Sequence, residues 1–260
     1  MIPLADVVRA LDAIAPPRLA AEWDNVGLLL EGTRPVQRIV VCVDLTAEVL
    51  AECLAAEADL VVAYHPPLFR PVSRLTSASA TGRTTLALIR AGVSLYAPHT
   101  ALDAVAGGMT DWLVTAGGPV TAVAPIVPRA DDPAAGSGRV GTLVAPQPLA
   151  VVVAAIKRSL GLDAVRVAAP AAPRPIARIA VCPGSGGGVV ERAPADLVLT
   201  GELRHHDVLA LVDRGTAVVL TDHTNSERGF LPHLVQRIAD RLAGVSVVAS
   251  TVDRDPLRIG

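Results

Sequence analysis

Hydrophobic and polar residues follow two periods along the chain, one typical of strands and one typical of helices. The short apolar runs 38–45 (RIVVCVDL) and 58–65 (ADLVVAYH) lie on either side of a helical pattern, TAEVLAECLAAE. A strand, a helix and a second strand in this order predict a βαβ unit with parallel strands. The N-terminal segment 1–17 has apolar residues at helical spacing with charges between them, so we expect an amphipathic helix and not a signal peptide.

The same order of motifs occurs twice. Arg-Ile-x-Val-Cys begins at residues 38 and 178, and Ala-Asp-Leu-Val begins at residues 58 and 195. Each half then continues through a helical pattern into a strand that ends in His-Thr-x-x-acid, at 99–103 and 223–227. Pieces that recur in the same order indicate a structural duplication.

The expected fold class is α/β, with two similar domains. Alternating strands and helices predict a largely parallel sheet in each domain, flanked by helices. Loops rich in Pro, Gly and Ala at 127–139 and 169–175 flank a predicted helix at 149–161. We therefore expect a first α/β domain over 1–125 and a second over 126–260, with a C-terminal strand able to pack back on the first.

Composition excludes several classes of protein. The longest apolar run, 149–156, is far shorter than the roughly 20 residues that cross a bilayer, so we expect no membrane span and place the protein in the cytoplasm. A formal charge of -2 with two residues each of Phe, Trp and Tyr gives no basic stripe, which disfavours nucleic acid as a partner. The three cysteines have no CxxC spacing and indicate neither a disulfide scaffold nor a zinc knuckle.

Histidines and carboxylates gather at the ends of the predicted strands. Active sites of α/β sheets form at the carboxyl ends of strands. Imidazole nitrogens together with carboxylate oxygens suit zinc, iron, manganese or similar divalent ions. The residues at or just beyond these strand ends are His65, His99, Asp103, His223 and Glu227.

A structural interpretation competes with metal binding. Thr224 and Glu227 fit the T-x-x-E capping box at the start of a predicted helix, and Asp103 could cap the turn that follows it. For one His-Thr-x-x-acid motif alone we favour capping, but the repetition of the motif favours metal ligation. Asp24 and Asn25, which precede an apolar strand, indicate only a turn.

Two further segments carry candidate chemistry. His205 and His206 occupy the second-half position that corresponds to the loop after His65, so they could transfer protons or contact substrate. A solvated helix start beside Asp207 is an equally good interpretation. The glycine-rich run 182–191 (CPGSGGGVVE) could hold a phosphate, but it lacks the ending of a P-loop, and a tight structural turn is at least as well supported.

Taken together, several motifs resemble a known family. They are EWDNVGLLLEG, VCVDLT, AYHPPLF, APHTALDAVAGGMTDWL, CPGSGGG, LTGELRHHDVLAL and DHTNSERGFLPHL. Their order over nearly the whole chain is similar to that of the Nif-three-like dinuclear-metal family, also called GTP cyclohydrolase 1 type 2 homologues. The resemblance implies two α/β domains with a metal site between them, and a homo-oligomeric ring of dimers, a hexamer. The chain matches the compact form, without an inserted middle domain.

The resemblance also implies a ligand set. Its metal ligands fall on His65, Asp103, His223 and Glu227, with His99 nearby as an added ligand or a supporting group. Tyr64 stands where many members have a histidine, and a phenol with a pKa near ~10 is a poorer ligand at neutral pH. We therefore expect one or two divalent ions per chain, zinc, iron or manganese.

Two functions remain open on these grounds. In the first, a metal-dependent hydrolase acts on a small-molecule substrate such as a nucleotide or phosphoester, with the acids anchoring the ions and His205 or His206 moving protons. Activity on guanine nucleotides is implied by the family name alone. In the second, the protein is a non-enzymatic, metal-binding oligomeric scaffold that binds partners.

Overall fold

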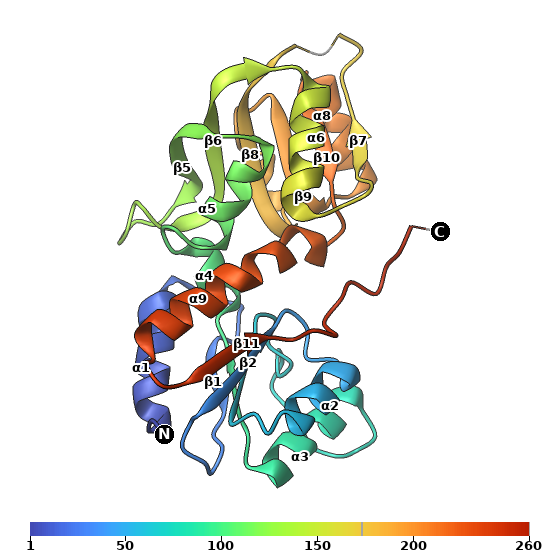
Figure 1. Cartoon of the computed structure of the whole chain (residues 1–260). Helices are drawn as coiled ribbons and strands as arrows, with labels where there is room; N and C mark the ends of the chain where they lie inside the picture. The colour runs from blue at the N-terminus through green and yellow to red at the C-terminus, as the bar shows by residue number, and fades with distance from the viewer. Residues whose placement is uncertain (173, 260) are drawn as a thin grey trace. The chain divides into compact units, whose positions relative to one another are not determined.

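The chain folds into two compact units. The computed structural model describes residues 1–172 and 174–259. Unit 1 comprises Met1–Leu102 and Leu231–Arg254, and unit 2 comprises Asp103–Phe230 and Asp255–Gly260. Each unit is a sheet flanked by helices, which confirms the expected α/β class (Figure 1). Within the described residues, no helix has both the length and the apolar character needed to cross a membrane.

The compact units do not follow the loop-rich segments. Unit 2 begins at Asp103, and the C-terminal helix and strand belong to unit 1. The segment 127–139, expected as a loop between domains, contains the turn of a β-hairpin inside unit 2. The expected loop 169–175 includes residue 173, which lies outside the described residues.

Unit 1 contains a five-stranded sheet in the order β1-β4-β3-β2-β11. Its strands are β1 (Gly27–Leu30), β2 (Arg38–Cys42), β3 (Leu60–Ala63), β4 (Ser94–Ala97) and β11 (Ser246–Ala249). Its helices are α1 (Leu4–Ile14), η1 (Pro17–Leu19), α2 (Ala47–Ala55), α3 (Ala80–Ala91) and α9 (Leu231–Arg241). Strand β1 is antiparallel and the other pairs are parallel, so the expected βαβ unit of β2, α2 and β3 is confirmed.

Helices cover both faces of this sheet. Val40 and Cys42 point to the face that α2 and α3 cover, where they pack against Val49, Cys53 and Leu88. Helices α1 and α9 pack against each other on the opposite face (Figure 1). Because side chains alternate along a strand, a strand covered on both faces is apolar throughout, as RIVVC is after its first residue.

Unit 2 contains a six-stranded sheet in the order β5-β6-β8-β9-β10-β7. Its strands are β5 (Val120–Pro128), β6 (Gly136–Gln147), β7 (Arg166–Ala168), β8 (Ile176–Ser185), β9 (Leu197–Glu202) and β10 (Ala217–Leu220). Its helices are α5 (Met109–Leu113), η2 (Val114–Gly117), α6 (Leu149–Leu160), α7 (Gly187–Val190), α8 (His205–Asp213), η3 (Thr224–Ser226) and η4 (Arg228–Phe230). The chain passes from unit 1 into unit 2 within α4 (His99–Ala104).

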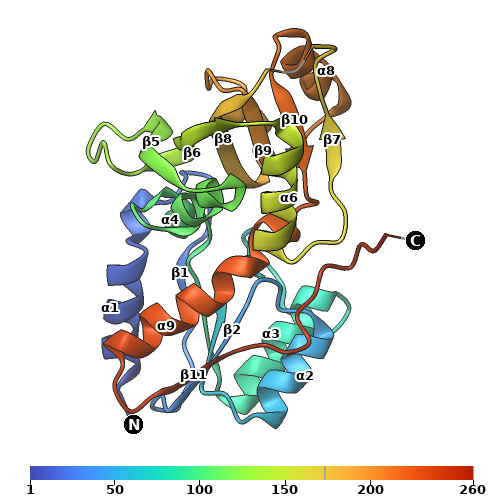
Figure 2. The same ribbon diagram turned by 45° about the horizontal axis from the view of Figure 1, so that its top comes forward.

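The second sheet is mixed. Its centre, β8-β9-β10, is parallel as expected, whereas β5, β6 and β7 pair antiparallel. One face packs against α6, where Val152 and Ile156 contact the sheet core, and the other face contacts Leu211 of α8. Figure 2 shows α6 in front of this sheet.

The duplication extends to individual hydrogen bonds. In unit 1, the Asp59 carboxylate accepts from the backbone N–H of Arg38 and of the residue before it, at 3.0 and 2.9 Å. In unit 2, the Asp196 carboxylate accepts in the same way from Arg178 and its preceding residue, at 2.9 and 3.0 Å. The repeated Ala-Asp-Leu-Val motif therefore anchors the start of the neighbouring strand in both units.

Candidate functional site

Two histidines of unit 1 follow the carboxyl ends of neighbouring parallel strands. His65 follows β3 and His99 follows β4, and their ring centroids are 5.4 Å apart. Nδ1 of His65 lies 2.8 Å from Oδ1 of Asp44, and Nδ1 of His99 lies 2.8 Å from Oδ1 of Asp24. Each of the two imidazoles therefore has its own carboxylate partner, and in both rings the bonded nitrogen is Nδ1.

These carboxylates determine what the imidazoles offer a ligand. A histidine whose Nδ1–H donates to a carboxylate presents its Nε2 lone pair outward and becomes more basic there, which is the usual arrangement of a metal-binding histidine. The Asp24 carboxylate, whose side chain is buried, also accepts from the N–H and hydroxyl of Thr100. Burial opposes ionisation of Asp24, but hydrogen bonds from His99 and Thr100 outweigh it, so the pKa of Asp24 lies below its ordinary value.

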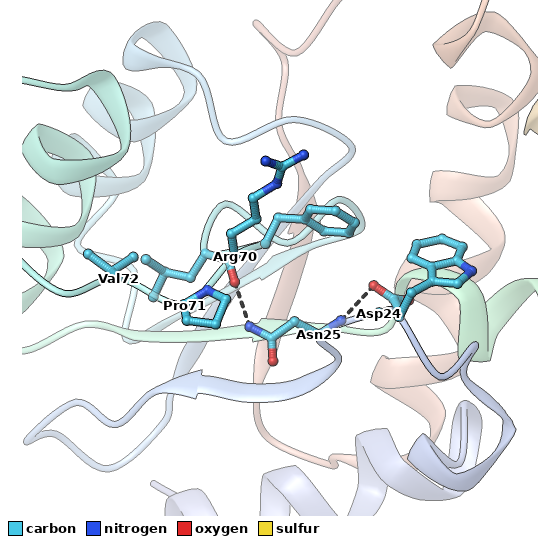
Figure 3. A pocket seen from close by; sticks show the side chains of 8 residues that line it. Asp24, Asn25, Arg70, Pro71 and Val72 are labelled. Atoms are coloured by element: carbon cyan, nitrogen blue, oxygen red, sulfur yellow. Dashed lines mark hydrogen bonds between the residues drawn. The ribbon is translucent and has the colours of Figure 1, made fainter.

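Aromatic rings surround His99. The ring centroids of Tyr64, Trp23 and Phe69 lie 5.4, 6.0 and 6.3 Å from that of His99. Tyr64 is buried, and its ring also lies 4.9 Å from the ring of His65. The Tyr64 ring therefore packs beside the rings of both histidines. Trp23 and Phe69 line an open cleft, which Figure 3 shows.

His223 and Glu227 lie together in unit 2. His223 Nε2 is 3.6 Å from Oε1 of Glu227, and His223 Nδ1 is 3.4 Å from Oε1 of Glu202, the last residue of β9. The Glu227 side chain is 2% exposed, whereas that of His223 is 38% exposed. A nearly buried carboxylate beside an accessible imidazole forms a His/Glu cluster that could hold a metal ion.

Glycines allow the backbone to approach this cluster. Gly184 has φ +61°, and a Cβ there would lie 2.8 Å from both Glu227 Oε1 and His223 Nε2. Its N–H donates to Ser226 Oγ at 2.8 Å, and the Ser226 hydroxyl donates to the His223 carbonyl at 2.6 Å. At Gly201, a Cβ would lie 2.8 Å from His223 Cα. The glycine-rich run therefore packs against the candidate ligands, and the helix that lies within the run, α7, has only four residues.

Asp103 lies on α4, at the start of unit 2. Burial raises the pKa of the Cys182 thiol to about 12, and the negative charges of Asp103 and Glu227 add to this shift. Both carboxylates therefore act electrostatically on the same thiol in β8.

The capping interpretation fails on the position of the helix. Helix α9 begins at Leu231, four residues after Glu227, and Thr224 instead starts a 3-10 turn with no side-chain cap hydrogen bond. The Thr224 hydroxyl donates to Asp255 and accepts from Arg228 Nε at 3.0 Å. Likewise, Gly108 is the N-cap of α5, with no side-chain cap. Neither acid of the repeated motif is explained by capping these helices.

His205 and His206 are the first residues of α8. Both are exposed, and their ring centroids are 5.6 Å apart. The neighbouring Arg204 forms an ion pair with Asp207 at 2.9 Å. This placement agrees with a solvated helix start, and a role in proton transfer stays a prediction.

Sequence reasoning missed the carboxylates that hold the histidines. Asp44 lies two residues after β2, and Asp24 lies in the turn before β1, where the pattern indicated only a turn. Glu202 occupies the place in β9 that His65 occupies after β3, since both follow Ala-Asp-Leu-Val by four residues. That correspondence within the duplication was the available signal for Glu202.

A family model and curated relatives both point to one family. Residues 2–256 match the Duf34/NIF3 family, described as NGG1p interacting factor 3. NIF3-like protein 1 of Drosophila melanogaster is 38% identical over 98% of this chain and 88% of its own length, and the NIF3 homolog of Schizosaccharomyces pombe is 37% identical over 96% and 95%. A hypothetical protein of Staphylococcus aureus superposes with a TM-score of 0.87 at 25% identity, over 99% of each chain. The resemblance is therefore confirmed in sequence and in fold, and the chain belongs to the Duf34/NIF3 family.

Proposed function

We propose that the protein binds one or two divalent metal ions and acts as a metal-dependent hydrolase on a small phosphoester or nucleotide. The proposed ligands are His65, His99, Asp103, His223 and Glu227. The observation that carries this proposal is the paired arrangement of strand-end histidines with acids: Asp44 and Asp24 hold the rings in unit 1, and Glu227 lies against His223 in unit 2. Zinc, iron and manganese suit this mixture of nitrogen and oxygen donors.

Each residue has a distinct task in this proposal. His65 and His99 supply Nε2 as ligand atoms, because Nδ1 of each ring is directed at a carboxylate. Asp103 and Glu227 supply negative charge. A bound divalent ion supplies a water of lowered pKa as nucleophile. The exposed imidazoles of His205 and His206 carry protons to and from solvent in this scheme.

Elemental analysis of gently purified protein tests the metal assignment. We expect one or two divalent ions per chain, and fewer in a variant that lacks both His223 and Glu227. Metal-loaded and chelated protein are then assayed on a panel of nucleotides, including GTP, and simple phosphoesters. Turnover that disappears on chelation and returns with one added ion supports a hydrolase. Protein that binds none of zinc, manganese and iron when they are added would contradict the proposal.

The family description favours a second candidate function. NGG1p interacting factor 3 is described by a partner and not by a reaction. In this alternative the chain is a metal-binding scaffold whose homo-oligomeric ring presents a surface to other proteins. Light scattering before and after chelation separates the two: assembly that depends on metal, without turnover on any substrate of the panel, favours the scaffold.

A further inference from the structure

Unit 1 exposes two large aromatic side chains at one place. Trp23 is 65% exposed and Phe69 is 41% exposed, and their ring centroids lie 5.9 Å apart at an angle of 58°. The whole chain has only two Trp and two Phe residues. Leaving one of each in solvent at a shared position forgoes the burial that normally stabilises such side chains, which marks a surface for binding.

These rings flank a cleft of about 470 Å³, within the range of ligand sites. Residues 23–25 form one wall and residues 68–72 form the other. The Asn25 amide donates to the Leu68 carbonyl, so the two walls are joined. Figure 3 shows Asn25 of one wall opposite Arg70 and Pro71 of the other. Asp24, between the two wall residues Trp23 and Asn25, holds the ring of His99. The cleft is therefore fixed directly beside a candidate metal ligand.

The cleft also carries positive charge. Arg70 lines it and an adjoining cleft of about 490 Å³, and Arg74 lines the second one. Both side chains are exposed. In the described part of the chain, neither guanidinium is paired with a carboxylate. An arginine without an acidic partner can bind a phosphate with two parallel hydrogen bonds.

We propose that this cleft binds the substrate as a nucleotide: Trp23 and Phe69 stack on a planar base, and Arg70 and Arg74 bind its phosphate. The inference rests on the proposed function, because it names the substrate class and places that substrate next to His99. Base stacking on aromatic side chains and guanidinium contacts to phosphate are how proteins hold nucleotides without a glycine-rich loop.

Calorimetric titration of the metal-loaded protein with GMP, guanosine and ribose 5-phosphate tests each half of the cleft. We expect Trp23→Leu and Phe69→Leu to weaken GMP and guanosine binding about tenfold, and Trp23→Phe to retain most of it. Arg70→Gln should weaken GMP and ribose 5-phosphate but not guanosine. Arg90→Gln, which removes the same charge from the far end of α3, is the matched control and should bind like wild type.

The outcomes separate this inference from the proposed function. Wild-type GMP affinity in both leucine variants overturns the cleft assignment, whether or not the protein hydrolyses anything. If the oligomeric state of these variants changes while GMP binding does not, Trp23 and Phe69 belong to a contact between copies of the chain. This result would also overturn the inference that the cleft binds a nucleotide. If GMP binding follows the predicted pattern in a protein that has neither metal nor turnover, the nucleotide-binding assignment of the cleft stands and the hydrolase proposal is contradicted.

Discussion

The histidines of the two units differ in how their nitrogens are held. His65 and His99 each have Nδ1 at 2.8 Å from a carboxylate, a normal hydrogen-bond distance. His223 lies 3.4 and 3.6 Å from Glu202 and Glu227, which is longer than a good hydrogen bond. The unit 1 rings are therefore oriented in advance, and we expect their carboxylates to contribute to metal affinity.

Replacing Asp24 with Asn tests this orientation. The amide keeps the shape of the side chain but removes the charge that holds the His99 ring. We expect metal affinity to fall tenfold or more, because loss of such a supporting group typically costs about 10- to 100-fold. Competition with a chromogenic chelator measures it. Asp12→Asn, which changes an acid bonded to Tyr96 in the same unit, is the control and should leave affinity unchanged.

Glu227→Gln separates ligation from structure at a single side chain. A ligand role predicts a loss of tenfold or more in metal affinity, about 1.4 kcal/mol, because a negative charge leaves the ion's contact shell. Asp103→Asn occupies the equivalent place in the first repeat and should behave in the same way. Equal affinity in wild type and both amide variants would show that the repeated motif holds no metal.

At the scale of elements, the turn after β8 depends on a glycine that leaves no room for a side chain. A Cβ on Gly186 would lie 2.7 Å from both Cys182 Cβ and Thr200 Oγ1, inside the buried centre of the sheet. A Cβ on Gly188, two residues later in α7, would have no atom within 4 Å. The two glycines therefore differ in packing although they belong to one run.

Alanine at these positions gives opposite results. We expect Gly186→Ala to destabilise the protein by about 1 to 3 kcal/mol, because the added methyl group overpacks the sheet. Gly188→Ala should be neutral or stabilise by up to about 1 kcal/mol through helix propensity. Urea unfolding measures both. Unchanged stability of Gly186→Ala together with lost binding of a phosphorylated ligand would instead favour a phosphate cradle.

The C-terminal strand is tied to α2 by one carboxylate. Glu52 accepts from the hydroxyls of Ser250 and Thr251 and from the Thr251 N–H at 2.9 Å. Burial raises the pKa of Glu52, but these hydrogen bonds outweigh burial, so its pKa lies below the ordinary value of 4.5. The charged form of Glu52 therefore fastens the segment that follows β11 to unit 1.

This contact should make stability depend on pH. A carboxyl group whose pKa is lowered by folding stabilises the protein above its ordinary pKa, and that contribution is lost as the pH falls through the lowered value. We expect Glu52→Gln to cost about 1 kcal/mol at pH 7. The difference from wild type should shrink as the pH falls below about 4.5. A stability difference between variant and wild type that is constant from pH 7 to pH 3 would contradict a role for the charged form of Glu52.

At the scale of the whole molecule, metal binding and folding are linked. A ligand that binds only the folded chain adds about 2.7 kcal/mol when its concentration is 100 times the Kd. We expect zinc or manganese to raise the thermal midpoint, chelator to lower it, and a His223→Ala and Glu227→Ala double variant to respond weakly. An equal rise in wild type and double variant would place the ion elsewhere.

The sequence by itself determines the order of elements and the duplication. Apolar runs with β-branched residues alternate with helical patterns, and these local signals predict β2, β3 and β4 and their counterparts β8, β9 and β10. The candidate ligands follow from the same reading, because strand-end positions are defined by the strands. Local periodicity is visible in the sequence without knowing which segments pack together, and this is why these features could be predicted.

The tertiary structure alone decides which distant residues meet. Strand β11 pairs with β2 more than two hundred residues away, and 127–139 closes a hairpin instead of linking domains. Asp24 reaches His99 across 75 residues, and nothing in its local pattern distinguishes it from an ordinary turn residue. Pairing between strands and hydrogen bonds between side chains depend on the folded backbone, so local periodicity predicts the strand-end histidines but not the carboxylates that orient them.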